Sequence, residues 1–317
     1  MKPTVLVLVY LSDEHRTLVG ERFNMIYAPN AHLGQDRSNG QAQIDAHGRE
    51  INVVLTNGTN GLLKSEIDRL PALALICTVG VGFENVDVAA AKARGIPVAN
   101  AAGTNDDCVA DHAMMLLLAA IRRLPFLNSG VRRGLWRDDI PRPPHVSHRR
   151  LGILGLGAIG KKVAQRALGF QMTIGYHNRR QRDDVDYAYF ADLNSLAQWC
   201  DFLLVAAPGG KETYHIINTE IMNAIGPQGV LVNVARGTLV DLDALGAALK
   251  EGRLMAAALD VYENEPTPPG PLLELENAVL TPHIAGISPE AIDASVRKFL
   301  ENAECFYAGK PLVTPVG

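Results

Sequence analysis

Three side chains suited to binding an anion and moving a proton lie in the C-terminal half of the chain. Arg236, Glu265 and His283 each follow a short apolar run that predicts a buried strand. In an open parallel sheet the carboxyl ends of the strands share one edge, and ligands bind there. We therefore expect these three side chains to meet at one edge of a sheet.

Together, these residue types fit the reduction of a carbonyl group by a hydride donor. His283 can give a proton to the nascent alkoxide, because imidazole titrates near neutral pH. Glu265 would favour the protonated ring and fix its orientation, with Glu263 as the alternative carboxylate. Arg236 would polarise the carbonyl and hold a substrate carboxylate. A single histidine or glutamate is more often structural, so the prediction depends on their combination.

The hydride donor is indicated by a glycine-rich turn. Gly155, Gly157 and Gly160 have the G-x-G-x-x-G spacing, with an apolar run before them. A helical segment at 161–168 and a second apolar run at 172–176 complete a strand–helix–strand unit. This context favours a dinucleotide-binding site over a glycine turn without a ligand.

Each glycine of this turn has its own expected role. Gly155 permits the tight turn, Gly157 lets a pyrophosphate approach the backbone, and Gly160 lets the helix pack close to the strand. The free N–H groups and positive dipole end of the helix then face the phosphates. Asp260, past a later strand, is expected to bind the carboxamide of the nicotinamide.

The end of the second strand predicts which coenzyme binds. An NAD site usually has Asp or Glu there for the ribose 2′-hydroxyl, whereas this chain has His-Asn-Arg-Arg at 177–180. Guanidinium groups bind a 2′-phosphate well, so we predict NADP(H), with Arg179 and Arg180 on the phosphate and Asn178 hydrogen-bonding nearby. The alternative is a solvated turn whose field is altered by the carboxylates at 183–184. NAD(H) remains a possible second coenzyme.

Alternating strand and helix patterns predict an α/β protein with two sheets. The longer alternation predicts a doubly wound sheet with strands at 151–155, 172–176, 202–206, 230–233, 256–260 and 278–280, and helices at 195–200, 219–225 and 241–251. A smaller α/β layer is predicted from strands at 4–10, 51–56, 74–77 and 97–99, and helices at 15–23, 64–70 and 87–94. The segment 31–48 is polar and has no clear periodicity.

The remaining segments suggest how the two layers are joined. A long helix over 106–124 is almost wholly apolar in its middle, so we expect it to be buried between domains or at a subunit interface. The Arg- and Pro-rich segment 125–150, with Trp136, is interpreted as an arm around a partner subunit, or alternatively as a surface loop. A final helix at 288–308 precedes a stretch at 311–316 that returns to the first layer.

These segments give the predicted domain organisation. A discontinuous substrate (lid) domain comprises 1–98 plus 287–317, and an NADP-binding domain comprises 99–286. Two chain crossings would form a hinge, with the active site in the cleft between the domains.

Composition agrees with this organisation. The 317 residues suggest about two domains, and the net charge of −4 argues against a nucleic-acid-binding protein. Four scattered cysteines lack metal or disulfide spacing, so we expect buried reduced thiols, no metal site and a reducing compartment. The apolar run at 5–11 is better explained as a first strand than as a signal peptide, and no run is long enough to span a membrane. We expect a soluble cytoplasmic protein.

Five stretches resemble motifs of the D-isomer-specific 2-hydroxyacid dehydrogenases: Gly152–Gly160, Asn233–Gly237, Ala258–Val261 with Glu265-Pro266, Thr281–Gly286 and Thr78–Asp87. The resemblance covers nearly the whole chain. It implies a Rossmann nucleotide domain with a smaller flavodoxin-like domain, and a homodimer formed through the nucleotide domain.

The resemblance also implies roles for individual residues. Arg236, Glu265 and His283 would be catalytic, and the amides of Val81 and Gly82 would bind the substrate carboxylate, since glycine-rich backbone can form an anion nest. Leu55 and the loop 79–83 are expected to line the pocket. Trp136 of a neighbouring subunit is expected either to close the pocket or to have a packing role. The predicted cofactor contacts are Gly155, Gly157, Ala158, Ile159, Gly160, Asn178, Arg179, Arg180, Ala207, Pro208, Thr213, Val234, Ala235, Arg236, Asp260, His283, Ala285 and Gly286.

Two departures from the family pattern affect these expectations. Many members have His-x-Pro-Leu-Thr where this chain has Ala-Ala-Pro-Gly-Gly-Lys-Glu-Thr at 206–213, which loosens the contact with the nicotinamide ribose. Phe83 and Glu84 stand where relatives often have Tyr and Asp. The arginines at 179–180 resemble NADP-preferring glyoxylate, hydroxypyruvate and hydroxyphenylpyruvate reductases.

These features predict NADPH-dependent reduction of a small 2-oxoacid, such as glyoxylate or hydroxypyruvate, to the D-2-hydroxyacid. An aryl-pyruvate reductase of the same family is the first alternative. A dinucleotide-sensing protein without useful turnover is the second, because fold alone does not fix function.

Overall fold

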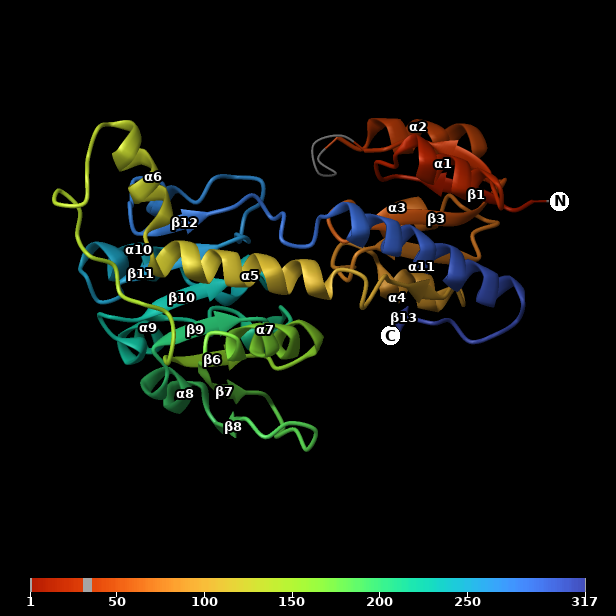
Figure 1. Cartoon of the computed structure of the whole chain (residues 1–317). Helices are drawn as coiled ribbons and strands as arrows, with labels where there is room; N and C mark the ends of the chain where they lie inside the picture. The colour runs from red at the N-terminus through yellow and green to blue at the C-terminus, as the bar shows by residue number, and fades with distance from the viewer. Residues whose placement is uncertain (1, 31–35, 317) are drawn as a thin grey trace. The chain divides into compact units, whose positions relative to one another are not determined.

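The computed structural model describes residues 2–30 and 36–316, which fold as two compact units. One unit consists of Met1–Asn105 with Ile287–Gly317, and the other of Asp106–Gly286 (Figure 1). The predicted boundary between residues 98 and 99 is corrected, because it falls inside strand β5 (Val98–Ala99), which pairs in the first sheet. Each unit is described by itself below.

The second unit has seven parallel strands in the order β12-β11-β10-β9-β6-β7-β8. They are β6 (Arg150–Leu154), β7 (Thr173–His177), β8 (Ala188–Tyr189), β9 (Phe202–Val205), β10 (Val230–Asn233), β11 (Ala256–Leu259) and β12 (Ala278–Leu280). The strand order reverses between β6 and β9, and ligands bind beside such a reversal in doubly wound sheets. This is the predicted Rossmann arrangement, with β8 as a further edge strand.

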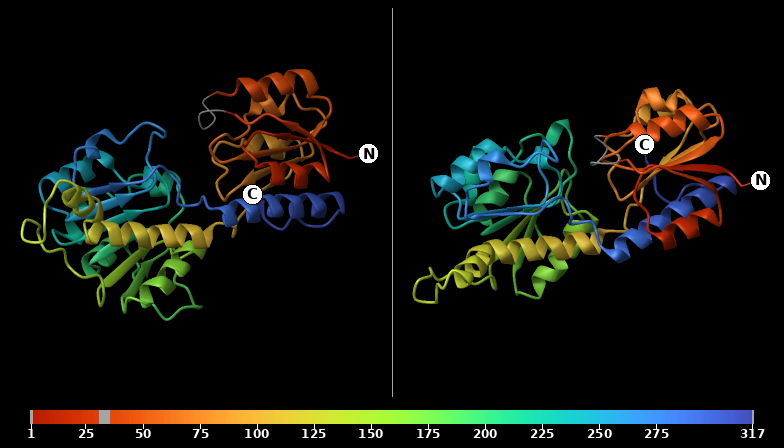
Figure 2. Two further views of the ribbon diagram at one scale, coloured as in Figure 1. Left: turned by 45° about the horizontal axis from the view of Figure 1, so that its top comes forward. Right: turned by 90° about the horizontal axis from the view of Figure 1, so that it is seen from above.

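Helices cover both faces of this sheet. Alternate strand residues such as Ile153 and Leu204 pack against α5 (Asp106–Ile121) and α7 (Ala158–Leu168). Their neighbours, such as Leu203, pack on the other face, where the helices are α8 (Leu193–Trp199), α9 (Thr219–Ile225) and α10 (Leu242–Lys250). Figure 2 shows α5 running along one side of the sheet in both views. Both faces are therefore buried, as the near-continuous apolar strands predict.

The long apolar helix is shorter than expected. It ends at Ile121, and Arg123 adopts a left-handed conformation with φ of 52° before α6 (Leu124–Arg132) begins. The predicted arm at 125–150 is therefore partly helical. Within the described residues no single helix is long and apolar enough to cross a membrane; α5 and α6 pass that test only as a pair bent by 60°.

The first unit has a six-stranded sheet in the order β13-β5-β4-β3-β1-β2, parallel except for β13. Besides β5, its strands are β1 (Thr4–Val7), β2 (Asn24–Tyr27), β3 (Ile51–Asn57), β4 (Leu75–Val79) and β13 (Pro315–Val316). The order β2-β1-β3-β4-β5 is that of flavodoxin-like folds. The pairing of β13 with β5 brings the C-terminal stretch into this sheet.

Five helices flank the first sheet. One face packs against α1 (Asp13–Gly20) and α11 (Pro289–Tyr307). The other face packs against α2 (Ser38–His47), α3 (Lys64–Ile67) and α4 (Val88–Ala93). Strand β2 and helix α2 are absent from the sequence prediction, since Ser, Asn, Gly and Gln in α2 obscure its periodicity.

The four cysteines are free thiols. Cys77 and Cys200 are buried, and burial raises the pKa of Cys200 to about 12. A thiol that stays protonated is a poor nucleophile and a poor metal ligand. Among the described residues no group of His, Cys, Asp or Glu has the arrangement of a metal site.

Candidate active site

The glycine turn after β6 has the geometry expected of a phosphate-binding turn. Gly155 has φ of 95°, and a Cβ there would lie 2.6 Å from the backbone of Ala207. A Cβ on Gly160 would overlap the carbonyl oxygen of Gly155, so helix and strand could not approach as they do. Gly157 is the N-cap of α7, and a Cβ there would meet nothing within 4 Å. The turn therefore leaves open space at Gly157, beside the helix N-terminus, where a pyrophosphate would fit.

The predicted coenzyme-selecting residues follow β7. Asn178, which directly follows β7, contacts the glycine turn. Its Oδ1 accepts a hydrogen bond from the Leu156 amide at 2.7 Å, which joins the end of β7 to that turn. Arg179 is 89% exposed and lies 4.0 Å from Glu212, which is also exposed. Arg180 is exposed beside it. Both arginines thus lie at the solvent-facing carboxyl edge of the sheet.

One of the two carboxylates at 183–184, that of Asp184, has basic partners of its own. Asp184 accepts hydrogen bonds from Arg182 at 2.6 Å and Lys161 at 3.1 Å. These hydrogen bonds hold the pKa of Asp184 well below its ordinary value. The charge of Asp184 is therefore compensated by Arg182 and Lys161.

The chain after β9 and β10 continues this edge. Ala207 and Pro208 follow β9, and the backbone of Ala207 is packed against Gly155. The Thr213 hydroxyl donates to Pro208 O at 3.1 Å, so it closes its own loop. Val234 and Ala235 follow β10 and are almost fully buried. Ala158 and Ile159, two further predicted cofactor contacts, are the first two residues of α7.

The histidine and glutamate predicted to act together are in contact. Nδ1 of His283 lies 2.6 Å from Oε2 of Glu265, whose other oxygen accepts the Tyr262 amide at 2.8 Å. The hydrogen bond to Glu265 raises the pKa of His283 and outweighs the opposing effect of burial. Burial by itself raises the pKa of Glu265, but the hydrogen bonds from His283 and Tyr262 bring it below its ordinary value. The pair therefore favours imidazolium and carboxylate.

Arg236 lies close to this pair. Its positive charge lowers the pKa of both Glu265 and His283. Its backbone is fixed by Asn233, whose Nδ2 donates to Arg236 O at 3.0 Å. The next residue, Gly237, packs so closely against the Tyr262 backbone that a Cβ would overlap it. The chain after β10 is thereby held against the chain that carries Glu265.

Glu263, the alternative partner of His283, has other contacts. It accepts from the Tyr214 hydroxyl at 2.9 Å, and its other oxygen lies 3.1 Å from Nε2 of His215. The rings of Tyr214 and His215 are stacked with centroids 3.9 Å apart. Glu263 therefore joins the loop after β9 to the loop after β11, and Glu265 is the carboxylate that contacts His283.

Asp260 is a buried anchor for the segment that carries His283. Its carboxylate accepts the Thr281 hydroxyl at 2.6 Å and the amides of Ile284 and Ala285 at 3.0 and 2.8 Å. The predicted contact with a nicotinamide carboxamide stays a prediction. Gly286, also predicted as a cofactor contact, ends this unit one residue after Ala285.

His112 in α5 belongs to the same anchor. Its Nε2 lies 3.0 Å from Thr281 Oγ1 and 3.4 Å from Asp260 Oδ1. His112 is not among the residues predicted from the sequence; its only signal is that it directly precedes the apolar run at 113–121. His112 helps to satisfy the buried carboxylate, which would otherwise be costly.

The predicted substrate residues of the first unit divide into two groups. Val81 and Gly82 follow β4 in a partly exposed loop, and neither amide donates to any partner within residues 2–30 and 36–316. Leu55 is corrected: it is fully buried in the core of the first unit, because it lies mid-strand in β3 between β1 and β4. Its side chain is not available to a ligand there. Trp136 is 66% exposed in the second unit.

Comparison with known proteins identifies the family to which this chain belongs. Residues 114–285 match the model of the D-isomer specific 2-hydroxyacid dehydrogenase, NAD binding domain. Hydroxyphenylpyruvate reductase of Plectranthus scutellarioides is 41% identical over 267 residues, which are 84% of this chain and 85% of that protein. A glyoxylate/hydroxypyruvate reductase of Arabidopsis thaliana is 37% identical and covers 85% of this chain and 84% of its own.

A solved structure agrees over the whole chain. The NADPH-dependent glyoxylate/hydroxypyruvate reductase of Sinorhizobium meliloti, in complex with NADP and malonate, has a TM-score of 0.87 and 33% identity, and the match covers 100% of this chain and 97% of that one. The glycine turn, its open face at Gly157 and the contact between His283 and Glu265 are consistent with such an oxidoreductase. The chain therefore belongs to the D-isomer specific 2-hydroxyacid dehydrogenases and contains their NAD-binding domain.

Proposed function

We propose that this protein reduces a small 2-oxoacid, such as glyoxylate or hydroxypyruvate, to the D-2-hydroxyacid with NADPH. The observation that carries the proposal is the 2.6 Å contact between His283 and Glu265 at the carboxyl edge of the sheet that also bears the open glycine turn. Relatives with 41% and 37% identity are hydroxyphenylpyruvate and glyoxylate/hydroxypyruvate reductases, which supports the same reaction class.

The residues would divide the chemistry as follows. Bound NADPH supplies the hydride that reduces the carbonyl carbon. Protonated His283 gives its proton from Nε2 to the carbonyl oxygen, while Nδ1 stays bonded to Glu265, which stabilises the imidazolium. Arg236 binds the substrate carboxylate with its planar guanidinium and polarises the carbonyl. The amides of Val81 and Gly82 supply further donors to the carboxylate.

Coenzyme preference rests on the segment after β7. We assign Arg179 and Arg180 to the 2′-phosphate of NADPH, because both are exposed at the sheet edge and no carboxylate occupies position 178. NAD(H) lacks that phosphate and is the weaker coenzyme in this proposal. Asp260 and the residues around the glycine turn would hold the remainder of either coenzyme.

We also propose that the protein is a homodimer through its second unit. A largely apolar groove of about 770 Å³ runs along α5 and the start of α6. It is lined by Met114, Met115, Leu118, Ala119, Leu124 and Phe170, together with the charged Asp111, Arg122 and Arg166. Met115 and Leu124 are 45% and 56% exposed, which is unusual for side chains of this size unless a partner covers them. The free thiols, of which Cys77 and Cys200 are buried and Cys108 and Cys305 are half-buried rather than buried as expected, support a reducing, cytoplasmic location.

The test is coenzyme oxidation with a panel of 2-oxoacids. Glyoxylate, hydroxypyruvate and 4-hydroxyphenylpyruvate are compared with NADPH and NADH, and the product is resolved on a chiral column. We expect the highest kcat/KM for a small 2-oxoacid with NADPH, and the D-product. A larger kcat/KM for 4-hydroxyphenylpyruvate would favour the aryl-pyruvate alternative, and tight NADPH binding without any turnover would favour the sensor.

A further inference from the structure

Two loops of the first unit are in direct backbone contact. The loop at the end of β3 comprises residues 57–61, with Asn57 as the last residue of the strand, and the loop after β4, residues 80–85, carries the amides of Val81 and Gly82. A Cβ placed on Gly58 would lie 2.6 Å from Oε2 of Glu84, 2.8 Å from the carbonyl carbon of Gly82 and 3.0 Å from the Gly82 Cα. Cβ atoms in proteins essentially never come that close, so any side chain at residue 58 must displace both the Glu84 carboxylate and the Gly82 backbone. The carboxylate is the end of a flexible side chain, whereas the Gly82 backbone can move only with its loop.

Hydrogen bonds join the same two loops on either side of that contact. The Asn85 amide donates to Gly58 O at 3.2 Å, and the Asn85 side chain donates to Thr59 O at 2.9 Å. Leu62 N donates to Asn85 O at 3.0 Å. The position of the second loop is therefore set by the first.

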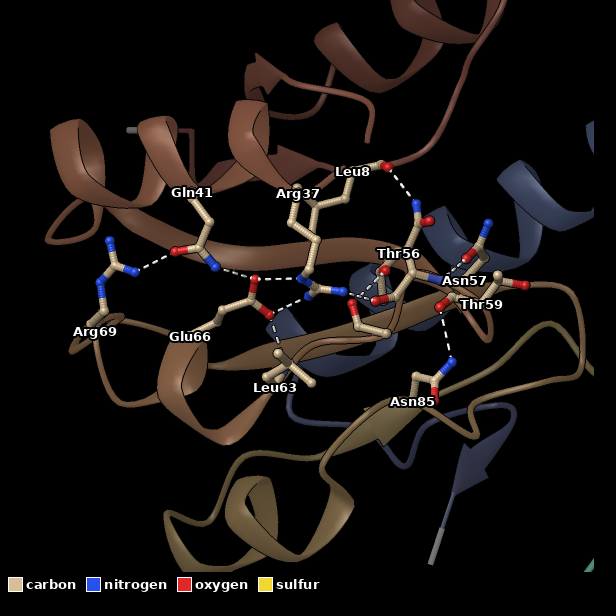
Figure 3. Close-up of polar contacts among 12 residues, drawn as sticks. Leu8, Arg37, Gln41, Thr56, Asn57, Thr59, Leu63, Glu66, Arg69 and Asn85 are labelled. Carbon is tan, nitrogen blue, oxygen red and sulfur yellow. Dashed lines mark hydrogen bonds and ion pairs between the residues drawn. The ribbon is translucent and has the colours of Figure 1, made fainter. Parts of the chain in front are cut away.

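The loop at 57–61 is itself fixed to the interior of the unit. The buried Asn60 side chain donates to Leu8 O at 2.7 Å, and the Thr56 hydroxyl donates to Gly61 O at 2.8 Å. Asn57 Oδ1 accepts the Asn60 amide at 2.6 Å. Figure 3 shows these contacts converging on the end of β3. The loop is thus held by the end of β3 and by Leu8, the residue that follows β1.

A buried ion pair braces the loop from the opposite side. Glu66 is only 3% exposed and forms a two-pronged contact with Arg37, whose third nitrogen binds Asn60 O. Gln41 and the Leu63 amide complete the partners of Glu66, at 2.6 and 2.8 Å. In Figure 3 the guanidinium of Arg37 lies between Glu66 and the loop. Bidentate buried pairs of this kind define geometry more than they add stability.

We infer that the loop at 57–61, through Gly58 and its brace of Arg37 and Glu66, is the positioning element for the anion-binding amides of Val81 and Gly82. The inference rests on the proposed function, since it deepens the role of those amides. None of these residues touches the reacting atoms; Gly58 acts by allowing Gly82 to lie where it does. Substrate affinity should therefore depend on residue 58, and coenzyme affinity should not.

Gly58→Ala tests this directly. Gly58 has no left-handed φ, so alanine is compatible with its backbone and only the added methyl group acts. We expect KM for glyoxylate to rise by about tenfold or more, with kcat changed less than threefold and the Kd of NADPH unchanged. Binding of oxamate to the NADPH-loaded enzyme should weaken by a similar factor. The matched control is Gly20→Ala in the same unit, where a Cβ meets nothing within 4 Å.

A second variant covers the case in which Gly58→Ala does not fold. Asn85 is exposed, and Asn85→Ala removes only its bond to Thr59, so the two loops are loosened without an internal clash. We expect KM and the oxamate Kd to rise while NADPH affinity is kept. An unchanged KM in a folded variant, with only the melting temperature lowered, would overturn the inference. If the wild-type protein reduces no 2-oxoacid and binds no oxamate, the proposed function fails first, and this inference with it.

Discussion

His283 and Glu265 lie 2.6 Å apart between Nδ1 and Oε2, although 17 residues separate them along the chain. The contact requires that the segment after β11 turn back toward the end of β12, and Asp260 provides the anchor by accepting the amides of Ile284 and Ala285. His283 itself has φ of 52°, a left-handed conformation that this anchor holds. The proton donor is therefore pre-positioned by the second unit alone.

The first prediction concerns pH. Because Glu265 raises the pKa of His283, the imidazolium persists to higher pH. Reduction needs that imidazolium, so its kcat/KM should be high below the pKa and fall as pH rises through it. Glu265→Gln removes the stabilising charge, and the fall should then occur at lower pH. Oxidation of the 2-hydroxyacid needs neutral imidazole, so its rise should move to lower pH as well.

The matched control for that experiment is Glu263→Gln. Glu263 contacts Tyr214 and His215, so its replacement should leave the pH midpoint in place. His283→Ala should reduce turnover by about 10²–10⁴-fold with little change in NADPH affinity. If both variants at 263 and 265 shifted the midpoint equally, the assignment of Glu265 would be wrong.

Arg236→Lys tests whether the guanidinium of Arg236 binds the substrate carboxylate through two parallel hydrogen bonds. An ammonium keeps the charge but cannot bind a carboxylate through two parallel hydrogen bonds, so kcat/KM should fall by about 10²-fold, a loss of about 3 kcal/mol. Arg253→Lys, which alters an ion pair with Glu251 elsewhere in the second unit, is the control and should be near normal. Steady-state kinetics with glyoxylate measures both. Near-normal kinetics for Arg236→Lys would exclude bidentate binding.

Coenzyme preference provides a third test. Replacing both Arg179 and Arg180 by Ala should weaken NADPH by about 10–100-fold and NADH by much less, because charge-assisted bonds to the 2′-phosphate are lost. Arg137→Ala changes an arginine of similar exposure, 85%, outside this edge and should alter neither. The readout is the ratio of the two dissociation constants by fluorescence titration. An unchanged ratio would remove the assignment of these arginines.

The sequence predicted the parallel strands and the contact of His283 with Glu265 because those features have local signals. Buried parallel strands appear in a sequence as short apolar runs, and the spacing of the glycines at 155, 157 and 160 is typical of a tight turn between a strand and a helix. The partner of His283 was predictable because residues at the carboxyl ends of neighbouring strands share one edge. What remained open there, Glu263 or Glu265, was decided by Tyr214 and His215, whose contacts depend on tertiary packing.

Other features had no local signal. The sequence predicts Leu55 as a residue lining the pocket, but its burial depends on β1 and β4, which lie on either side of β3. The break between α5 and α6 occurs at Arg123, which is not a residue that marks a left-handed turn. The ion pair of Arg37 with Glu66 joins residues 29 positions apart, and nothing in the neighbouring sequence distinguishes either of them from a charged residue on the surface. Such contacts follow from packing and are not encoded in spacing.

The glycine turn gives a fourth prediction that separates folding from binding. Gly155→Ala should destabilise the protein by at least about 2 kcal/mol, because φ of 95° and the close backbone of Ala207 both oppose a Cβ. Gly157→Ala should leave stability within about 0.5 kcal/mol but weaken NADPH by about tenfold or more, since its Cβ would occupy the space where a pyrophosphate fits. Thermal unfolding and NADPH titration measure the two effects. Equal loss of stability in both variants would mean that Gly157 serves the fold and not the ligand.

The last prediction concerns the groove along α5. Its exposed Met115 projects from a helix whose other apolar residues are buried in the second unit, apart from the half-buried Cys108 and Leu118, so an apolar strip remains uncovered there. We expect a mass near twice 34.2 kDa in solution. Met115→Asp places a carboxylate in that strip, and burying an unpaired charge costs several kcal/mol, so the variant should sediment as a monomer. Leu273→Asp is the control, because Leu273 is 54% exposed but lies outside the groove. If both variants remain dimeric in analytical ultracentrifugation, the subunits meet through another surface.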